Sequence, residues 1–407
     1  MGDPATVYGT GELTAQTIIE TDEAGPDLPE ILFRSDHVEV RRIAAGDGRH
    51  QVVTFESYHD DAGFDRIGFG ETFFERAGFT GIHVLSAGND WYQYPEIGAV
   101  LAIIRDAVAG AESVLAYGSS MGGYAAVRFA DAIGATDVLA LSPQYSIDPR
   151  RMKADKRWWW DQRRIQFLPE HNGPLTCRAR VVIAFDPTIK LDLLHAERIG
   201  HDVKADLLRL DYAGHPVTTV LAELGLLQKM ALAFASGSAD PATIQSEFLA
   251  RREDASMWLA EYGSRLPDGD KSRARDLAAR AVAIAPGNAT IQHQYGMRLH
   301  ELGRYDEAIV AHEMAVAASP HPIFVLSLSR SLFHAGRFED AVNRAEQALA
   351  ERSFDSEYFR WAARARRGAG DPTGAYEHAR SAFRLARTIR NLVSLLRYRI
   401  GLVRANG

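Results

Sequence analysis

The stretch Tyr117-Gly118-Ser119-Ser120-Met121-Gly122-Gly123-Tyr124 contains a serine, Ser120, with a glycine two residues before it and two residues after it. The apolar run 113–117 leads into this stretch, and a helix is predicted to begin near Met121. A sharp strand-to-helix turn strains its central residue, and flanking glycines avoid clashes with the neighbouring backbone. The sequence therefore predicts a serine nucleophile at Ser120; the alternative is a glycine-rich turn that packs closely for structural reasons alone.

Outward from this turn, short apolar and β-branched runs alternate with helical stretches. The runs are 51–55, 82–85, 113–117, 137–141, 181–185 and 206–210, and the helical stretches are 65–77, 95–109, 121–133, 191–200 and 217–227. Several runs are apolar throughout, which is typical of strands covered on both faces. The series predicts an α/β domain at residues 36–235, with a mostly parallel sheet and helices on both faces. Residues 1–35 are predicted to form an N-terminal arm or edge hairpin.

A serine hydroxyl needs a general base, normally a histidine that is held by a carboxylate. Asp186 ends the predicted strand 181–185, and His215 lies in a loop after the last predicted strand. Both therefore belong to the carboxyl edge of the sheet, where open parallel sheets carry their active sites. We expect a triad of Ser120, Asp186 and His215, with Asp192 as the alternative acid.

These residues resemble the α/β-hydrolase superfamily of serine hydrolases over somewhat less than half of the chain. The resemblance implies an oxyanion hole of backbone N–H groups, one of them from Met121. It implies a second donor after the run 51–55, where Ser57 or Tyr58 is the candidate. The chain departs from the family here, because Glu56-Ser57-Tyr58-His59 replaces the common His-Gly signature.

The segment 142–176 interrupts the strand–helix rhythm and is predicted to form a lid, which we place at about 143–176. Three residues near the predicted carboxyl edge are candidates for substrate binding: Trp91, Tyr92 and Gln144. Ordinary packing beneath the lid is the alternative for Trp91 and Tyr92.

The predicted lid combines basic residues with three consecutive tryptophans, 158–160. One interpretation is a basic, aromatic surface that attracts an anionic or sugar-containing substrate. A second is contact with nucleic acid, and a third is an amphipathic lid helix with solvated arginines and buried tryptophans.

After about residue 240 the strand signals end, and a period of 33–34 residues begins. Glycines recur at this period, followed at fixed distances by small residues: Gly269, Gly303, Gly336 and Gly370; Ala274, Ala308, Ala341 and Ala375; Ala281, Ala315, Ala348 and Ala382. Glycine allows a tight turn between paired helices, and alanine lets helices approach closely. Pro286 and Pro320 close the first two units.

This pattern resembles the tetratricopeptide repeat (TPR). It implies an all-α repeat domain at 255–407, after a linker helix at 236–254. The units are 255–288, 289–321, 322–355 and 356–389. A capping helix at 390–404 is expected to cover the last exposed face with Leu392, Leu395, Leu396 and Ile400.

Composition narrows the function classes. The net charge of −7 argues against a general nucleic-acid binder. The single cysteine, Cys177, forms no internal disulfide, and no residue cluster has metal-ligand spacing. We expect a cytoplasmic protein without a signal peptide, membrane span, metal or other cofactor.

The sequence thus predicts a serine hydrolase that acts on a carboxylic ester, thioester or related acyl bond of a small-molecule or carbohydrate substrate. One alternative is an acyltransferase to an alcohol or sugar, which uses the same triad. Another is a TPR-based interaction scaffold with a vestigial hydrolase domain. The repeats are expected to bind a protein partner or to mediate self-association.

Overall fold

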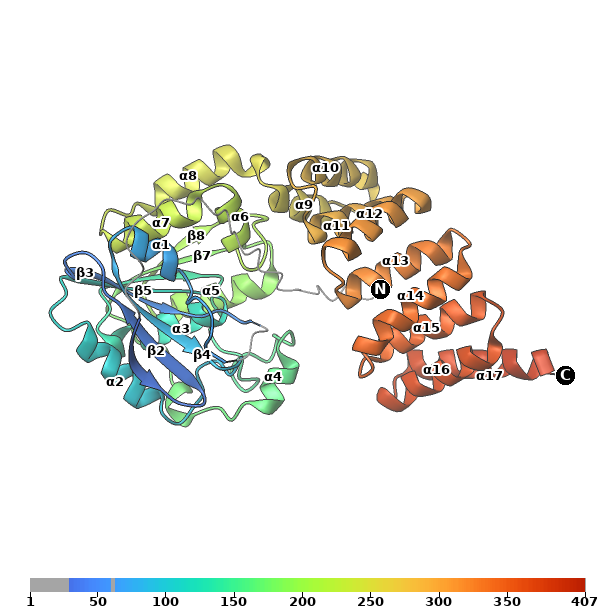
Figure 1. The fold of residues 1–407 in the computed structure, drawn as a ribbon, viewed down its shortest axis with the longest axis horizontal. Helices are drawn as coiled ribbons and strands as arrows, with labels where there is room; N and C mark the ends of the chain where they lie inside the picture. The colour runs from blue at the N-terminus through green and yellow to red at the C-terminus, as the bar shows by residue number, and fades with distance from the viewer. Residues whose placement is uncertain (1–28, 60–62, 407) are drawn as a thin grey trace. The chain divides into compact units, whose positions relative to one another are not determined.

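The computed structural model describes residues 29–59 and 63–406, with side chains up to residue 401. The first 28 residues of the predicted arm lie outside this range. The chain divides into two compact units, Met1–Trp258 and Leu259–Gly407, each with its own elements (Figure 1).

The first unit contains one eight-stranded sheet in the order β1-β2-β4-β3-β5-β6-β7-β8. The strands are β1 (Glu30–Arg34), β2 (Val38–Ile43), β3 (His50–Phe55), β4 (Thr80–Ser86), β5 (Ser113–Ser119), β6 (Asp137–Leu141), β7 (Arg180–Phe185) and β8 (Ala205–Arg209). From β4 to β8 all neighbours are parallel, whereas β2 pairs antiparallel with both β1 and β4. The sheet is therefore mixed, and its parallel part holds all six strands that the sequence predicts.

Helices cover both faces of this sheet (Figure 1). They are α1 (Glu71–Arg76), α2 (Ile97–Ala107), α3 (Met121–Ile133), α4 (Trp159–Arg164), α5 (Lys190–Asp202), α6 (Thr218–Glu223), α7 (Leu226–Ala235) and α8 (Pro241–Arg251). Two predicted helices are shorter or broken because a glycine adopts a left-handed conformation. Gly70 (φ 74°) precedes α1, and Gly225 (φ 68°) separates α6 from α7. The predicted linker helix folds as α8 and the 3₁₀ helix η2 (Arg252–Asp254), and α8 packs against β8 and α7.

The core lies on both sides of the central strands. Val53, Ala116 and Ile183 are fully buried in the cluster that includes residues of α2, α3 and α5. Val52 and Val182, which point to the opposite face, are also fully buried. The uniformly apolar strands therefore match a sheet that is covered on both faces.

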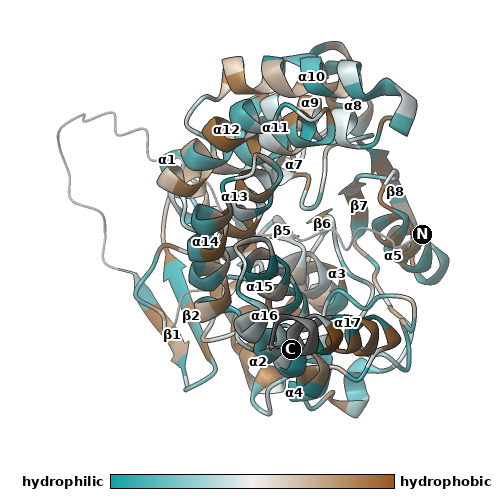
Figure 2. Cartoon of the chain, turned by 90° about the vertical axis from the view of Figure 1, so that its right-hand side faces the viewer, coloured by the Kyte–Doolittle hydropathy of each residue, from teal (hydrophilic) through white to brown (hydrophobic). Residues whose placement is uncertain are grey.

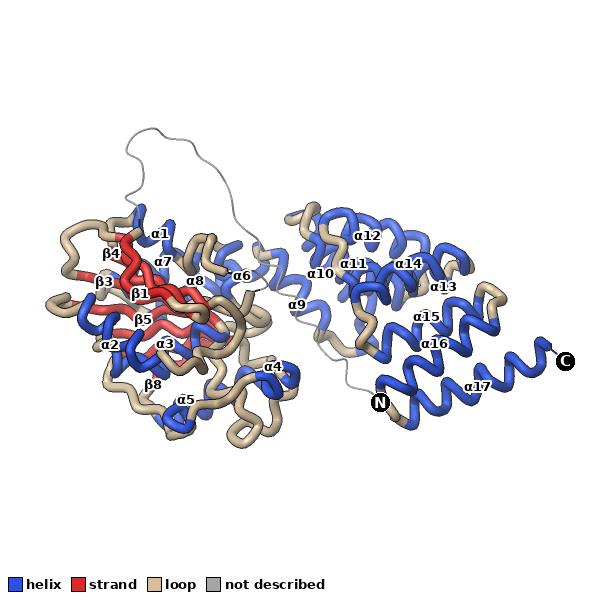
Figure 3. Tube along the Cα trace, turned by 60° about the horizontal axis from the view of Figure 1, so that its bottom comes forward, coloured by secondary structure: helices blue, strands red, loops and turns tan. Residues whose placement is uncertain are grey.

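The second unit is a series of paired helices, most clearly seen as a tube in Figure 3. They are α9 (Ser256–Ser264, which begins just before the unit boundary), α10 (Lys271–Ile284), α11 (Ala289–Glu301), α12 (Tyr305–Ala318), α13 (Pro322–His334), α14 (Phe338–Glu351), α15 (Ser356–Gly368), α16 (Pro372–Leu385) and α17 (Ile389–Asn406). Each helix from α10 onward packs against the next, and α11, α13, α15 and α17 also pack against one another in series.

Three of the four repeat glycines and all of the repeated alanines do what their spacing predicts. Gly303, Gly336 and Gly370 have φ values of 74°, 81° and 79° in the turns between paired helices. Gly269 instead lies in the 3₁₀ helix η3 (Asp268–Asp270). The repeated alanines are all buried, with relative exposures of 4% or less. Small side chains at these positions therefore let the helices pack closely.

The capping helix differs from its prediction. Of the four residues expected to cover the last face, Leu392, Leu396 and Ile400 are 40%, 48% and 55% exposed. Asn391 is fully buried instead, and its side-chain amide donates to the carbonyls of Ala382 and Ala386 at 3.0 and 2.7 Å. With Asn391 facing inward, these apolar residues of α17 are exposed, and Figure 2 shows hydrophobic stretches of this helix in brown.

Candidate active site

The turn at Ser120 is a strained strand-to-helix junction. Strand β5 ends at Ser119 and helix α3 begins at Met121, while Ser120 has φ 49° and ψ −112°. A Cβ on Gly118 would lie 2.3 Å from the backbone of Gly122, and a Cβ on Gly122 would lie 2.1 Å from the carbonyl oxygen of Phe55. Because neither position has space for a side chain, both glycines are needed for this turn.

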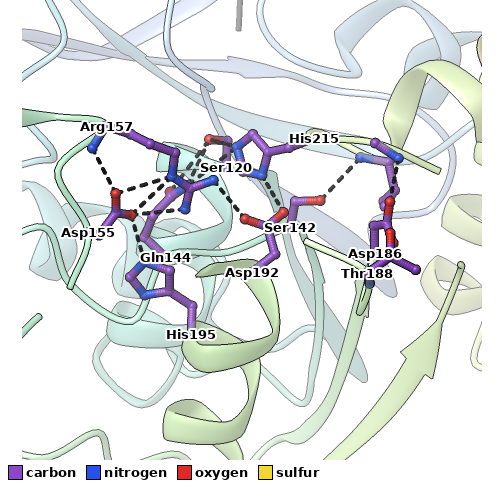
Figure 4. Close-up of polar contacts among 12 residues, drawn as sticks. Ser120, Ser142, Gln144, Asp155, Arg157, Asp186, Thr188, Asp192, His195 and His215 are labelled. Carbon is purple, nitrogen blue, oxygen red and sulfur yellow. Dashed lines mark hydrogen bonds and ion pairs between the residues drawn. The ribbon is translucent and has the colours of Figure 1, made fainter. Parts of the chain in front are cut away.

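The hydroxyl of Ser120 lies within hydrogen-bond distance of a buried histidine. Ser120 Oγ is 3.1 Å from His215 Nε2, and His215 Nδ1 is 2.6 Å from Asp192 Oδ2 (Figure 4). The side chains of His215 and Asp192 are only 4% and 2% exposed. Burial opposes ionisation of Asp192, but the charge and hydrogen bond of His215, together with Arg157, hold the pKa of this carboxyl below its ordinary value.

The acid beside His215 is therefore Asp192, and the order in which the sequence ranked Asp186 and Asp192 is corrected. Asp186 Oδ1 accepts hydrogen bonds from the N–H and hydroxyl of Thr188 and from the N–H of Tyr212, and Oδ2 accepts from the N–H of Gly214 (Figure 4). Asp186 thus ties the end of β7 to the loop that carries His215. Asp192 contacts the imidazole of His215 from the first turn of α5.

The second oxygen of Asp192 is also occupied. Arg157 donates to Asp192 Oδ1 at 2.8 Å and to both oxygens of Asp155 at 2.9–3.2 Å. Asp155 in turn lies 2.9 Å from His195 Nε2, while His195 Nδ1 accepts from the N–H of Tyr145. A network of buried charges therefore links segment 143–176 to the carboxylate that contacts His215.

Gln144 contacts the serine directly. Its Nε2 donates to Ser120 Oγ at 3.1 Å and lies 3.5 Å from His215 Nε2, and the residue is 1% exposed. Gln144 follows β6, which pairs with β5, the strand that leads into the turn at Ser120. The neighbouring Ser142 accepts a hydrogen bond from the N–H of Val217, which fastens the loop after His215.

The expected oxyanion donors border the same turn. Met121 is the first residue of α3, so its N–H has no partner within the helix. Ser57 and Tyr58 follow the end of β3, whose Phe55 pairs with Gly118 of β5. Glu56, just before them, is held by Arg66 and by the N–H of Ser86.

Trp91 and Tyr92 are packing residues. Tyr92 is fully buried, and its hydroxyl donates to the carbonyl of Glu56 at 3.0 Å. Trp91 is 1% exposed, and its ring packs against Tyr58 and Trp158 with centroids 5.7 and 4.9 Å apart. Neither side chain faces open solvent, which agrees with the packing alternative. Substrate contact by Trp91 or Tyr92 stays a prediction.

Segment 143–176 is mostly irregular, with α4 and the short 3₁₀ helix η1 (Pro169–His171). Several of its arginines are bound within the unit: Arg150 pairs with Asp148, Arg164 pairs with Asp161, and Arg157 bridges two aspartates. Trp159 and Trp160 are 48% and 63% exposed. Trp158 is only partly buried, so the segment does not have the buried tryptophans of the amphipathic-helix interpretation.

The sequence analysis did not predict the roles of Arg157 and Asp155, although Arg157 belongs to the basic residues of the predicted lid. The signal was weak, because a basic residue two positions after an aspartate is common on protein surfaces. Among residues 29–59 and 63–406, no cluster of histidine, cysteine and acidic side chains has the geometry of a metal site. In the same residues, no helix is both long and apolar enough to cross a membrane.

No protein-family model matches the chain, and no curated protein matches its sequence. Similar solved structures include the first TPR of Spaghetti (RPAP3) bound to the HSP90 peptide SRMEEVD. It is 19% identical, covers 28% of this chain and 94% of the other, and has a TM-score of 0.27. The Sgt2 TPR domain from Aspergillus fumigatus is 20% identical over 29% and 81% of the two chains, with a TM-score of 0.28.

MamA from Desulfovibrio magneticus RS-1, from residue 41 to its end, is 18% identical over 40% of this chain and 96% of the other, with a TM-score of 0.33. These neighbours are TPR repeat proteins, but likeness at this level supports no inference about function. The helical-repeat architecture rests on this chain's own helix pairs and turn glycines.

Proposed function

We propose that the first unit is a serine hydrolase that forms an acyl-enzyme on Ser120. The observation that carries this proposal is the continuous chain from Ser120 Oγ through His215 to Asp192, with separations of 3.1 and 2.6 Å at a strained turn. The order serine, aspartate, histidine along the chain is that of the α/β-hydrolase superfamily. The sharp turn between β5 and α3, with Ser120 at its centre, also fits that superfamily.

In the proposed reaction, Ser120 Oγ attacks the acyl carbon of an ester or thioester while His215 Nε2 takes the hydroxyl proton. Collapse of the tetrahedral intermediate breaks the bond to the leaving group, and His215 returns the proton to it. Water then attacks the acyl-enzyme with His215 as the base, which releases the acid and restores Ser120. Asp192 stabilises the protonated imidazole, and Arg157 positions Asp192.

Two groups are proposed to stabilise the oxyanion. The N–H of Met121 is one, as in the resemblance to the superfamily. The side-chain amide of Gln144 is a second, because its Nε2 lies 3.1 Å from Ser120 Oγ and is therefore close to the acyl group that bonds to this oxygen. Side-chain amides are suitable oxyanion donors. Ser57 and Tyr58 remain the backbone candidates for the same role.

Ser120 is only 4% exposed, so an acyl substrate needs a change in its surroundings. We propose that segment 143–176 acts as the lid, because its Arg157 is bonded to Asp192 and its Trp158 packs on Trp91.

The acyl acceptor decides between hydrolase and acyltransferase. If a sugar or another alcohol replaced water, the same acyl-enzyme would transfer its acyl group to that alcohol.

Turnover of p-nitrophenyl esters with acyl chains of two to eight carbons tests this proposal. Hydrolysis by the wild type should fall by about 10⁵–10⁶-fold in Ser120→Ala and in His215→Ala. An acyl adduct on Ser120 should be detectable by intact-protein mass spectrometry. Equal turnover by the wild type and Ser120→Ala would remove Ser120 from the chemistry.

For the second unit, we propose that the helical repeats bind a protein partner along the helices α11, α13, α15 and α17. Such arrays present an extended inner surface of first helices, on which a peptide can lie. Selection of a peptide library against the full chain tests this proposal. Selected peptides should lose binding when residues of these helices are substituted and retain it when residues of α14 or α16 are substituted. The opposite pattern would contradict it.

A further inference from the structure

The repeat unit contains a pocket of about 480 Å³, and its lining residues are polar or charged except for Trp361. All of its lining residues come from α11, α13, α15 and α17, the first helices of successive pairs. Five of them are arginines: Arg330, Arg360, Arg364, Arg390 and Arg397. The only acidic residue in the lining is Glu357. We call this surface the arginine groove.

Three of these arginines occupy the same position of the repeat. Arg330, Arg364 and Arg397 are each the ninth residue of their helix, in α13, α15 and α17 respectively. Equivalent positions on stacked repeats face the same side, so the three guanidinium groups form a column along the groove. Packed helices lie about 8–10 Å apart, which sets the approximate spacing of the column. The column begins at α13, because the ninth residue of α11 is Met297.

Most of this positive charge has no counter-ion in the part of the chain that the structure describes. Arg330 pairs with Glu357 at 2.8 Å. Among residues 29–59 and 63–401, whose side chains the structure describes, no ion pair is present at the other four arginines of the groove. Arg360 is half-buried, and burial followed by the nearby charge of Arg390 lowers its pKa. The arginines of the groove thus repel one another, and an anion would relieve that repulsion.

The histidines of the groove do not add to its charge at neutral pH. Burial, followed by the charges of His334 and Arg330, lowers the pKa of His300 to about 4. Burial and the charge of Arg364 also lower the pKa of His334. Binding that depends on the guanidinium groups should therefore hardly change between about pH 6 and pH 8.

We propose that the arginine groove binds an extended acidic peptide segment of a partner, whose carboxylates pair with the column of Arg330, Arg364 and Arg397. An extended chain in the polyproline II conformation has three residues per turn and rises about 3.1 Å per residue. Carboxylates three residues apart therefore lie on one side of the peptide, about 9 Å apart, and match the column. Guanidinium groups pair with carboxylates through two parallel hydrogen bonds, which makes them specific for such ligands. This proposal rests on the partner-binding function proposed for the repeats.

The groove favours a peptide over a nucleic acid. Single-stranded nucleic acids bind through aromatic side chains on which their bases stack. Trp361 is only 8% exposed, and the guanidinium groups of Arg330 and Arg364 already lie over its ring at 5.5 and 5.2 Å. This indole therefore offers no open platform to a base.

The test is fluorescence anisotropy with the full chain and a fluorescein-labelled twelve-residue peptide that has glutamate at every third position, separated by serine and glycine. The peptide should bind, and affinity should fall at least tenfold in Arg364→Gln/Arg397→Gln and severalfold in Arg390→Gln. The matched control, Arg380→Gln/Arg384→Gln on exposed positions of α16, should bind like the wild type. Arg390 has no ion pair among the described residues, so its variant tests the charge without disturbing a contact.

Three results would overturn the proposal: equal binding of a peptide with glutamine in place of glutamate, equal affinity of the groove and control variants, or tighter binding of a twelve-residue oligothymidylate. Absence of binding by the acidic peptide would overturn it too. The library could instead yield peptides without acidic residues that bind the same helices. That result would reject the proposal of an acidic peptide but would leave the proposal that these helices bind a partner. If no peptide of any kind binds these helices, both proposals fail.

Discussion

At the scale of single residues, the hydrogen bond between Asp192 and His215 determines which carboxylate supports the proposed base. Asp192→Asn should slow the reaction of Ser120 with diisopropyl fluorophosphate by about 10⁴-fold, because the amide favours the wrong tautomer of the imidazole. Asp186→Asn should react much faster than Asp192→Asn, since Asp186 bonds to backbone groups of the His215 loop. Rates of inactivation, corrected for the folded fraction, measure the difference. The reverse order would assign the role to Asp186.

The glycines that flank Ser120, Gly118 and Gly122, give a second prediction at the residue scale. Gly122→Ala should lower the free energy of unfolding by about 1–3 kcal/mol or more, because its Cβ would meet the carbonyl oxygens of Phe55 and Glu56 at 2.1 and 2.7 Å. Gly98→Ala is the control, since a Cβ there meets nothing within 4 Å. Urea denaturation followed by circular dichroism compares them. Equal stability of the two variants would mean that the turn tolerates a side chain.

The sequence predicted Ser120 and His215 because a motif and a loop position point to each of them. It ranked Asp186 above Asp192 wrongly, because the choice depends on where α5 begins. Asp186 directly follows a strand, which made it the favoured acid. The turn from Asp186 to Lys190 and the first turn of α5 bring Asp192 to the imidazole instead. Asp186 and Asp192 are only six residues apart, and a pattern of strands and helices does not show which of the two carboxylates points to His215.

At the scale of elements, the network around Arg157 joins segment 143–176 to α5. Burial opposes ionisation of Asp155, yet the hydrogen bonds from His195 and Arg157 hold its pKa well below the ordinary value of 3.8. A carboxyl with a depressed pKa stabilises the fold above its unfolded-state pKa, and this contribution is lost as pH falls through the lower folded-state value.

Asp155→Asn should therefore melt at a lower temperature than the wild type near pH 7, and the difference should shrink below about pH 4. Differential scanning fluorimetry between about pH 7 and pH 2.5 measures it. Asp268→Asn, at an exposed position, is the control and should show no such gap. A gap that stays constant down to the lowest pH would show that the carboxylate charge of Asp155 contributes no stability.

Elements whose patterns are regular were predictable, and irregular ones were not. The α3 range 121–133 was predicted to the residue, because a glycine-rich turn precedes it and Gly134 ends it. Strand β1 lies within the range predicted as an N-terminal arm or edge hairpin, and it is an edge strand paired antiparallel with β2. Strand β2 was not recognised, since it reads Val-Glu-Val-Arg-Arg-Ile and its charges interrupt the apolar pattern. In α17 the apolar residues were visible, but their direction depends on Asn391. Asn391 binds two backbone carbonyls of the preceding helix pair.

At the scale of the whole molecule, each unit has a core of its own. Ala341 is fully buried in the second unit, where it packs with Ile309, Leu328 and Leu332. Ala341→Leu should destabilise the repeats by about 1–3 kcal/mol through overpacking. Hydrogen–deuterium exchange should then rise in α13 and α14 and stay unchanged in β5 and α3. Ala318→Leu, at an exposed position, should change neither. A rise in the sheet as well would contradict separate cores.

The central claim is that Ser120 is an activated nucleophile, and mapping the adduct of a small fluorophosphonate tests it most directly. The wild type, Ser119→Ala, Ser120→Ala and His215→Ala should be treated with diisopropyl fluorophosphate, together with Trp158→Ala, which loosens the contact over Trp91. The account predicts one adduct, on Ser120, in the wild type, Ser119→Ala and Trp158→Ala, and none in the other two. Modification that persists in Ser120→Ala, or folded wild type and Trp158→Ala that both remain unmodified, would contradict it.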